Sequence, residues 1–313
     1  MGKLPFALLV ALLLTAAPPA PINQRMLLRI PFRAQGDTLP LDGIIVKLNG
    51  AVARATRLLK PGDDMLLLLV LDLSGDLTLI GAARSALLAQ LEALPENVRV
   101  GLLRTQDDLR VLSDPAEPRE ALASSIEALS VSPRPALLSS LESIEELADS
   151  VSAKAHVRVA TLFVSDSNVA NYREDYTNPV VNSSDSGDMS RRFPEGLIQE
   201  RIRQLSASRG KGENPMYLVH LQYLGDRLNT AYQTGLIDLF RATGGSSEFC
   251  RSISEIPSSL EKTMAAVLSQ YSVEVEWPTP RTRQVDVVVE AGDREIHFRP
   301  RRSLPKTKAK KEQ

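Results

Sequence analysis

The feature that most constrains this chain is a short apolar run, residues 65–71, that ends abruptly in the polar residues Asp72, Ser74 and Asp76. A run of this length, closed by a carboxylate, a hydroxyl and a glycine, predicts a strand buried on both faces of a parallel sheet. Its polar end then lies at the carboxyl edge of the sheet, where open α/β folds bind their ligands.

After this strand, short apolar runs alternate with patterns of helical period. We expect further strands at 98–103, 157–164, 216–221 and around Phe249. Helices are expected at 78–94, 119–129, 137–151, 196–207, 228–242 and 256–268. Alternation of this kind predicts βαβ units, and therefore an α/β fold with a doubly wound, mostly parallel sheet.

Both ends of the chain have the alternating pattern of half-buried antiparallel strands. Residues 26–60 predict three or four strands, with a hairpin turn at Asn49-Gly50. Strands are also expected at 270–277, 284–289 and 295–299. No helices separate these C-terminal strands, so they cannot extend the parallel sheet. We therefore expect a small β-domain in which the N- and C-terminal strands pack together.

The start of the chain predicts a targeting segment. Lys3, an apolar stretch at 4–17 and small residues up to Ala20 are typical of a secretory signal peptide, with an uncleaved anchor as the alternative. Export to the periplasm or beyond is expected, with no membrane span in the mature chain. The predicted division is a signal peptide at 1–20, N-terminal strands at 25–64, the α/β domain at 65–270, C-terminal strands at 271–302 and a basic tail at 303–313.

Composition limits the partners and the chemistry. The formal net charge is −1 and aromatic residues make up 4 % of the chain, which argues against a nucleic-acid partner. Cys250 is the single cysteine, so no intramolecular disulfide is possible, and we expect a buried structural thiol. The three histidines are widely spaced, which argues against a zinc site.

Four segments together carry a family resemblance. They are 71–75, 163–166, Ala242-Thr243-Gly244-Gly245 before a strand, and 268–273. In this order the chain resembles a secreted bacterial protein with a von Willebrand factor A domain, of the type common in Acidobacteria, over about residues 25–300. The resemblance implies a von Willebrand factor A-like, Rossmann-like fold. It also implies a metal-ion-dependent adhesion site built from an Asp and two Ser in a first loop, a Thr in a second and an Asp in a third.

The resemblance assigns Asp72 and Ser74 to the first loop and Asp166 to the third. Asp76 stands where the family has its second serine, and no threonine stands at the matching place in the second loop, where Arg134 or the next residue, a proline, is found. These departures favour a degenerate site. In that case Arg134 is expected to pair with the acidic side chains in place of a cation.

Two other interpretations of the site stay open. Asp72, Ser74, Asp76 and Asp166 hold Mg2+ or Ca2+ in an altered geometry, which Ca2+ tolerates better. Alternatively, Asp72 and Ser74 only cap the following loop and helix.

A long polar segment, Ser165 to Glu195, follows the third predicted strand of the sheet. Loops of this length are usually functional or poorly ordered, and a solvated insertion without a partner is the plain alternative. Tyr172, Arg173 and Tyr176 are candidate partner contacts, because Tyr and Arg are common binding anchors.

The function predicted from these features is a non-catalytic, exported protein-interaction or adhesion module with a degenerate metal site. It would bind a protein partner through the top of the sheet and the 165–195 segment, with no cofactor. The alternatives are cation-dependent binding through Asp72, Ser74, Asp76 and Asp166, or a hydrolase with an acidic site at the same edge. The common phosphate-binding, zinc-protease and nucleophile-elbow motifs do not occur in the sequence, which argues against an enzyme.

Overall fold

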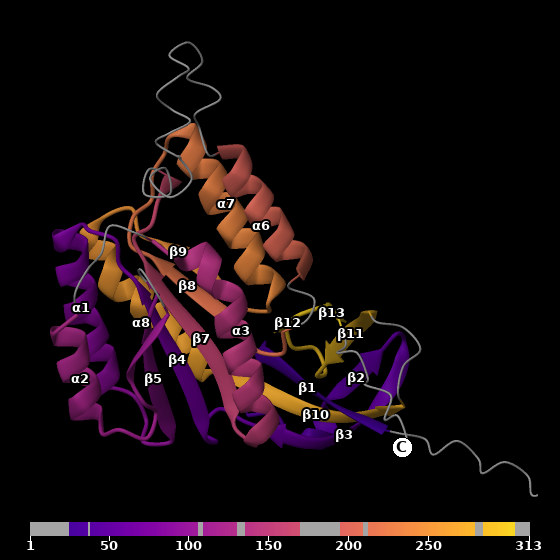
Figure 1. Ribbon diagram of the computed structural model, residues 1–313. Helices are drawn as coiled ribbons and strands as arrows, with labels where there is room; N and C mark the ends of the chain where they lie inside the picture. The colour runs from indigo at the N-terminus through magenta and orange to yellow at the C-terminus, as the bar shows by residue number, and fades with distance from the viewer. Residues whose placement is uncertain are drawn as a thin grey trace, which may run out of the picture.

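The structure is a computed structural model in which two β-sheets are joined along one side (Figure 1). It describes residues 25–36, 38–105, 109–129, 135–169, 195–208, 212–278 and 284–303. One sheet has six strands, in the order β6-β5-β4-β7-β8-β9, and the other has seven, in the order β12-β1-β10-β3-β2-β11-β13. Within the described residues, no helix combines the length and the apolar character needed to cross a membrane.

The six-stranded sheet confirms the expected mostly parallel α/β arrangement. Its strands are β4 (Met65–Asp72), β5 (Val98–Arg104), β6 (Arg110–Ser113), β7 (Arg158–Ser165), β8 (Met216–His220) and β9 (Ser247–Phe249). All neighbours run parallel except β6, which is antiparallel to β5 and was not predicted. The carboxyl ends of the five parallel strands therefore meet at one edge, called the carboxyl edge below.

Helices cover both faces of this sheet. They are α1 (Leu77–Glu92), α2 (Arg119–Glu127), α3 (Leu137–Lys154), α6 (Glu195–Ser208), α7 (Arg227–Ala242) and α8 (Ile256–Leu268), with short 3-10 turns η1 (Leu41–Gly43) and η2 (Ile253–Glu255). The cores place α1, α2 and α8 on one face and α3, α6 and α7 on the other (Figure 1).

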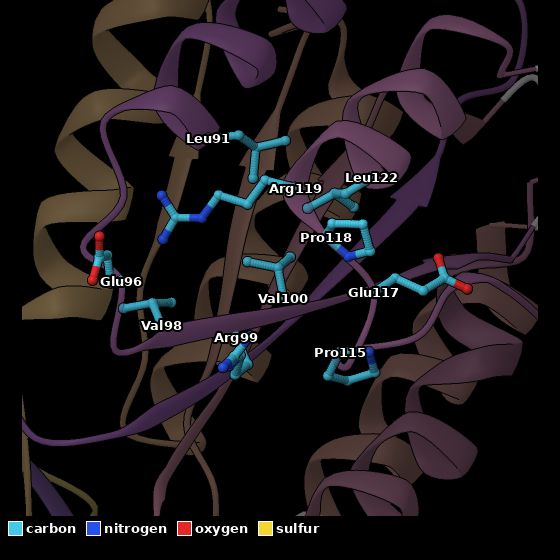
Figure 2. A pocket seen from close by; sticks show the side chains of 10 residues that line it. All are labelled: Leu91, Glu96, Val98, Arg99, Val100, Pro115, Glu117, Pro118, Arg119 and Leu122. Carbon is cyan, nitrogen blue, oxygen red and sulfur yellow. The ribbon is translucent and has the colours of Figure 1, made fainter.

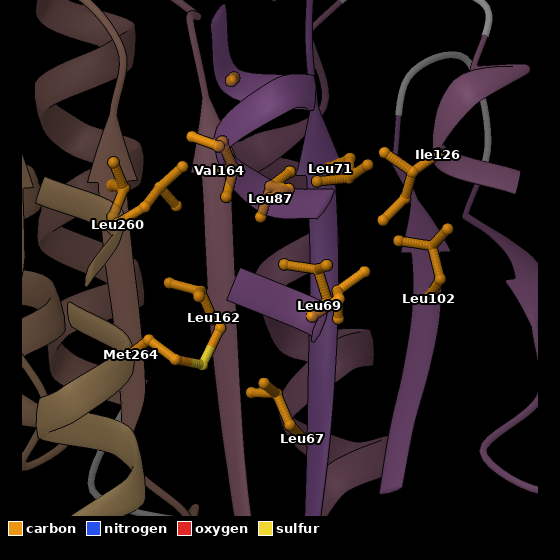
Figure 3. Close-up of a cluster of buried hydrophobic side chains, with 14 of the residues drawn as sticks. Leu67, Leu69, Leu71, Leu87, Leu102, Ile126, Leu162, Val164, Leu260 and Met264 are labelled. Atoms are coloured by element: carbon orange, nitrogen blue, oxygen red, sulfur yellow. The ribbon is translucent and has the colours of Figure 1, made fainter. Parts of the chain in front are cut away.

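The central strand β4 shows why the apolar run forms a buried strand. All eight of its residues are buried. The odd-numbered leucines of 67–71 pack with Leu87, Leu102 and Leu260 on one face (Figure 3), and the even-numbered residues of 66–70 pack on the other. Each fully buried side chain contributes about 1.5–3 kcal/mol, so the run stabilises both layers and fixes the position of the polar residues that follow it.

Strands from both ends of the chain form the seven-stranded sheet. They are β1 (Arg25–Ala34), β2 (Ile45–Leu48), β3 (Ala51–Leu59), β10 (Gln270–Pro278), β11 (Gln284–Glu290), β12 (Ile296–Phe298) and β13 (Arg301–Ser303). Long antiparallel ladders join β1 to β10 and β10 to β3. Its inner face buries a separate apolar cluster that includes Phe32 stacked on Tyr271. The domain boundaries given above stay a prediction.

Two arginines with little exposed surface join the seven-stranded sheet to the α/β layer. Arg29 of β1 donates to the carbonyl oxygens of Ser152 (2.7 Å) and Ala155 (3.1 Å) at the end of α3. Arg158 of β7 donates to the carbonyl oxygens of Leu268 and Gln270, both at 3.0 Å, where α8 leads into β10. These charge-assisted bonds satisfy backbone groups that would otherwise be buried without partners, so they fix one sheet against the other.

Candidate functional site

The predicted first-loop and third-loop residues meet at the carboxyl edge. Asp72 ends β4 with no exposed surface, and Asp166 follows β7 with 4 % exposed. Ser74, 5 % exposed, lies between them and donates its hydroxyl to Asp166 at 2.9 Å. Parallel pairing of β4 with β7, in which Asp72 is opposite Ser165, brings these segments together.

The Asp72 carboxylate accepts four hydrogen bonds from the protein itself. One oxygen accepts from the Thr105 hydroxyl and the Ala136 backbone N–H, both at 2.8 Å. The other accepts from the Leu137 backbone N–H and the Ser165 hydroxyl, both at 3.2 Å. Ala136 is the N-cap position of α3 and has no side chain able to cap it, so Asp72 caps this helix from the neighbouring strand.

The Asp166 carboxylate also accepts four hydrogen bonds from protein donors. One oxygen accepts from the backbone N–H and the hydroxyl of Ser74. The other accepts from the backbone N–H groups of Gly75 at 3.1 Å and Asp76 at 3.4 Å. A carboxylate has about four lone-pair positions, so both acidic residues have a donor for each of them.

The Asp76 side chain makes its hydrogen bonds with the first turn of α1. Asp76 is the N-cap of α1, and one carboxylate oxygen accepts from the backbone N–H groups of Thr78 (2.9 Å) and Leu79 (3.3 Å). An Asp at this position satisfies free N–H groups and interacts favourably with the helix dipole. Its role in the described geometry is therefore to start a helix.

Burial shifts the titration of Asp72. Loss of hydration raises its pKa to about 6, with a smaller contribution from the charge of Asp166, while hydrogen bonds from Ala136 and Thr105 oppose the rise. Asp72 is consequently still ionised at neutral pH, in agreement with four donors pointing at it.

A chain of three hydroxyl groups links Asp72 to helix α7. Ser165 donates its hydrogen to Asp72, so its oxygen accepts from the Ser167 hydroxyl at 2.8 Å. Ser167 in turn accepts from the Tyr232 hydroxyl of α7 at 3.1 Å. The ring of His220 lies beside this chain, with Nε2 2.6 Å from the Ser167 carbonyl oxygen, and burial lowers its pKa.

The residues present do not fit the cation that the family resemblance implies. A divalent cation needs carboxylate and hydroxyl lone pairs directed at one point, whereas those of Asp72 and Asp166 are directed at protein donors. Among the described residues, no group of three or more His, Cys, Asp or Glu side chains is placed to hold a metal ion.

Other predicted site residues lie outside the described part of the chain. Arg134, Tyr172, Arg173 and Tyr176 are in this group, so their contacts stay a prediction. Sequence reasoning missed Thr105, which directly follows the buried strand β5, next to the strand that Asp72 ends. The rule that polar residues after parallel strands share one edge would have found it.

A cavity of about 380 Å3 lies at the opposite edge of the sheet, beside the start of β5 (Figure 2). Leu91, Val98 and Leu122 contribute apolar walls. Arg119 donates to the carbonyl oxygens of Leu94 and Pro95, just after α1, and so has a structural role. Neither Asp72 nor Asp166 lines this cavity, so it is separate from the candidate site.

Comparisons with known proteins complete the description. No protein-family model matches the sequence, and a search of curated proteins gives no match. Solved structures with some likeness include von Willebrand factor A domains and a thread matrix protein. The von Willebrand factor type A protein from Catenulispora acidiphila has a TM-score of 0.42 at 11 % identity, covering 90 % of this chain and 74 % of its own. The von Willebrand factor domain of the type V pili tip protein Mfa5 from Porphyromonas gingivalis has a TM-score of 0.43 at 12 % identity, covering 66 % and 95 %.

Proximal thread matrix protein 1 from the mussel byssus has a TM-score of 0.42 at 10 % identity. The match covers 64 % of this chain, which spans 48 % of that protein's length. Likenesses at this level carry no conclusion about ligands or partners.

Proposed function

We propose that this protein is an exported, non-catalytic protein-interaction or adhesion module that binds a protein partner at the carboxyl edge of the six-stranded sheet, without a divalent cation. The 165–195 segment is part of the proposed surface, because it follows Asp166 at this edge. The metal-ion-dependent adhesion site of the family is degenerate in this proposal.

One observation carries the proposal: Asp72 and Asp166 each accept four hydrogen bonds from protein donors. Binding a cation would require several of these bonds to break, and each bond to a charged group contributes about 1.5–3 kcal/mol. The two carboxylates act instead as structural centres that tie together β4, β7 and the starts of α1 and α3.

The burial of Asp72 and Asp166 argues against the hydrolase alternative. General acids and bases must come within hydrogen-bond distance of a substrate. Asp72 has no exposed surface and Asp166 has 4 %, while the more exposed Asp76 is engaged with the first turn of α1. The buried Asp72 and Asp166 are therefore poorly placed to transfer a proton to a bound molecule, which disfavours this alternative.

A photo-crosslinking experiment tests the proposal. A photoreactive amino acid replaces Thr78, which is exposed at the carboxyl edge, or Glu96, which is exposed at the opposite edge. Both proteins are mixed with envelope and surface extract of the source cells, with EDTA or with millimolar Mg2+. We expect crosslinks to one protein from position 78, unchanged by EDTA, and none from position 96. Equal crosslinking at both positions, or loss in EDTA, would contradict the proposal.

A further inference from the structure

Arg251 and Tyr223 form a stacked pair at the carboxyl edge, on the side of β8 and β9. The guanidinium carbon of Arg251 lies 5.7 Å from the centre of the Tyr223 ring. The backbone fixes both residues, since Tyr223 N–H donates to the Cys250 carbonyl oxygen at 2.7 Å and Arg251 N–H donates to Glu255 at 2.8 Å. Stacking of this kind holds the guanidinium plane in one orientation.

The charge of Arg251 is available to a ligand. Its side chain makes no ion pair or hydrogen bond with any part of the chain that the structure describes, and both Arg251 and Tyr223 are exposed. The nearby Glu255 carboxylate is engaged with the Arg251 backbone N–H rather than with the guanidinium. An ordered, unpaired guanidinium is a good receptor for a carboxylate, which it binds through two parallel hydrogen bonds.

Two aliphatic side chains lie at the same edge. Leu77, the first residue of α1, is 73 % exposed, and Ile253, the first residue of η2, is 44 % exposed. α1 and η2 contact each other, so these side chains belong to neighbouring elements. Exposed aliphatic side chains on neighbouring elements offer apolar area that a partner can bury on contact.

We infer that Arg251, Tyr223, Leu77 and Ile253 bind a partner segment in which a carboxylate side chain stands next to an aliphatic residue. This inference rests on the proposed function and names the chemistry of its partner. Arg251 supplies the positive charge that pairs with the carboxylate of the partner segment. The aliphatic neighbour of the carboxylate then covers Leu77 or Ile253.

The test uses the whole protein in EDTA and two probes, acetyl-leucyl-glutamate amide and acetyl-leucyl-glutamine amide. NMR follows the Arg251 Nε–H signal and the Tyr223 amide signal. We expect saturable shifts with the glutamate probe and binding at least about tenfold weaker with the glutamine probe, because a charge-assisted bond is lost.

Two variants provide the control. Arg251→Gln is expected to weaken binding of the glutamate probe about tenfold, whereas Arg99→Gln, at the opposite edge, leaves it unchanged. The double variant Leu77→Asn with Ile253→Asn should weaken both probes equally, because both probes carry leucine. Equal binding of the two probes, equal effects of Arg251→Gln and Arg99→Gln, or a requirement for Mg2+ would overturn the inference. Crosslinking at position 78 that persists in Arg251→Gln would leave the proposed function intact while refuting this partner chemistry.

Discussion

The carboxylate of Asp72 lies 2.8 Å from the backbone nitrogen of Ala136, a residue 64 positions later in the chain. Ala136 is the N-cap of α3, and its side chain cannot accept a hydrogen bond. Asp72, the last residue of β4, therefore accepts from the free N–H groups at the start of this helix, which leads into the neighbouring strand β7. The residue that the family resemblance assigns to a cation therefore serves a positive helix end.

Stability should depend on the ionisation of Asp72. Burial raises its pKa from 3.8 to about 6, so the folded protein binds a proton more tightly than the unfolded chain does. The contribution of Asp72 is thus greatest below about pH 4 and falls as the pH rises to 6, by about 3 kcal/mol. Urea unfolding of the wild type and Asp72→Asn between pH 4 and 7 measures this. The free energy of unfolding of the wild type, relative to that of Asp72→Asn, should fall across that interval. The same pH dependence in both proteins would contradict a raised pKa of Asp72.

Thr105 should tune the same titration. Its hydroxyl donates to Asp72 at 2.8 Å and favours the ionised carboxylate. Thr105→Val removes that donor, so the pKa of Asp72 should rise above its wild-type value and the protein should lose about 1–3 kcal/mol of stability. Carbon-13 NMR of the labelled carboxyl group follows the titration. Thr105→Ser keeps the hydroxyl and is the matched control, and a wild-type pKa in the valine variant would refute this role.

Divalent cations should not change the melting temperature. A ligand at 100 times its dissociation constant adds about 2.7 kcal/mol of stability, which a melting curve detects readily. The carboxylate oxygens of Asp72 and Asp166 already accept hydrogen bonds from protein donors. We therefore expect the same melting temperature in EDTA and in millimolar Mg2+, Mn2+ or Ca2+. A rise of several degrees that is absent in Asp72→Asn would instead show a working metal site.

Much of the α/β layer could be predicted from the sequence because its signals are local. The run at 65–71 and the polar residue after it define a buried parallel strand without reference to the rest of the chain. The helix predicted at 228–242 spans Arg227–Ala242 in the structure, and Gly244 just after it adopts a φ of +88°, which glycine allows. β6 was missed because a strand of four residues, half exposed at a sheet edge, has too little alternation to be recognised.

The site was less predictable because hydrogen-bond partners depend on tertiary structure. The sequence pattern correctly brings Ser74 and Asp166 to one edge, but it cannot tell whether their oxygens face a cation or protein N–H groups. That Asp72 caps α3 depends on the absence of a capping side chain at Ala136 and on the approach of two segments far apart in sequence. A hydrogen bond of this kind cannot be predicted from the local sequence around either residue.

The ion pair of Arg29 and Glu274 joins neighbouring strands of the seven-stranded sheet where that sheet meets the end of α3, and it provides the last prediction. Arg29 donates to Glu274 at 2.8 Å, and their side chains are 11 % and 6 % exposed. Arg29 also donates to the hydroxyl and carbonyl oxygens of Ser152 in α3. Glu274 therefore neutralises the charge that joins β1 and β10 to the α/β layer.

Glu274→Gln should destabilise the protein by about 3 kcal/mol at pH 7, because it leaves the buried Arg29 charge without its counter-ion. The matched control is Glu276→Gln on the same strand, whose 3.8 Å pair with the exposed Arg54 should contribute less than about 1 kcal/mol. Burial alone would raise the pKa of Glu274, but hydrogen bonds from Arg29 and His156 hold it below 4.5. The wild-type advantage is therefore present above pH 4.5 and shrinks as the pH falls through the folded-state pKa. Urea unfolding at pH 7 and pH 3.5 measures both effects. Equal losses of unfolding free energy in the two variants would show that the Arg29–Glu274 pair does not stabilise the fold.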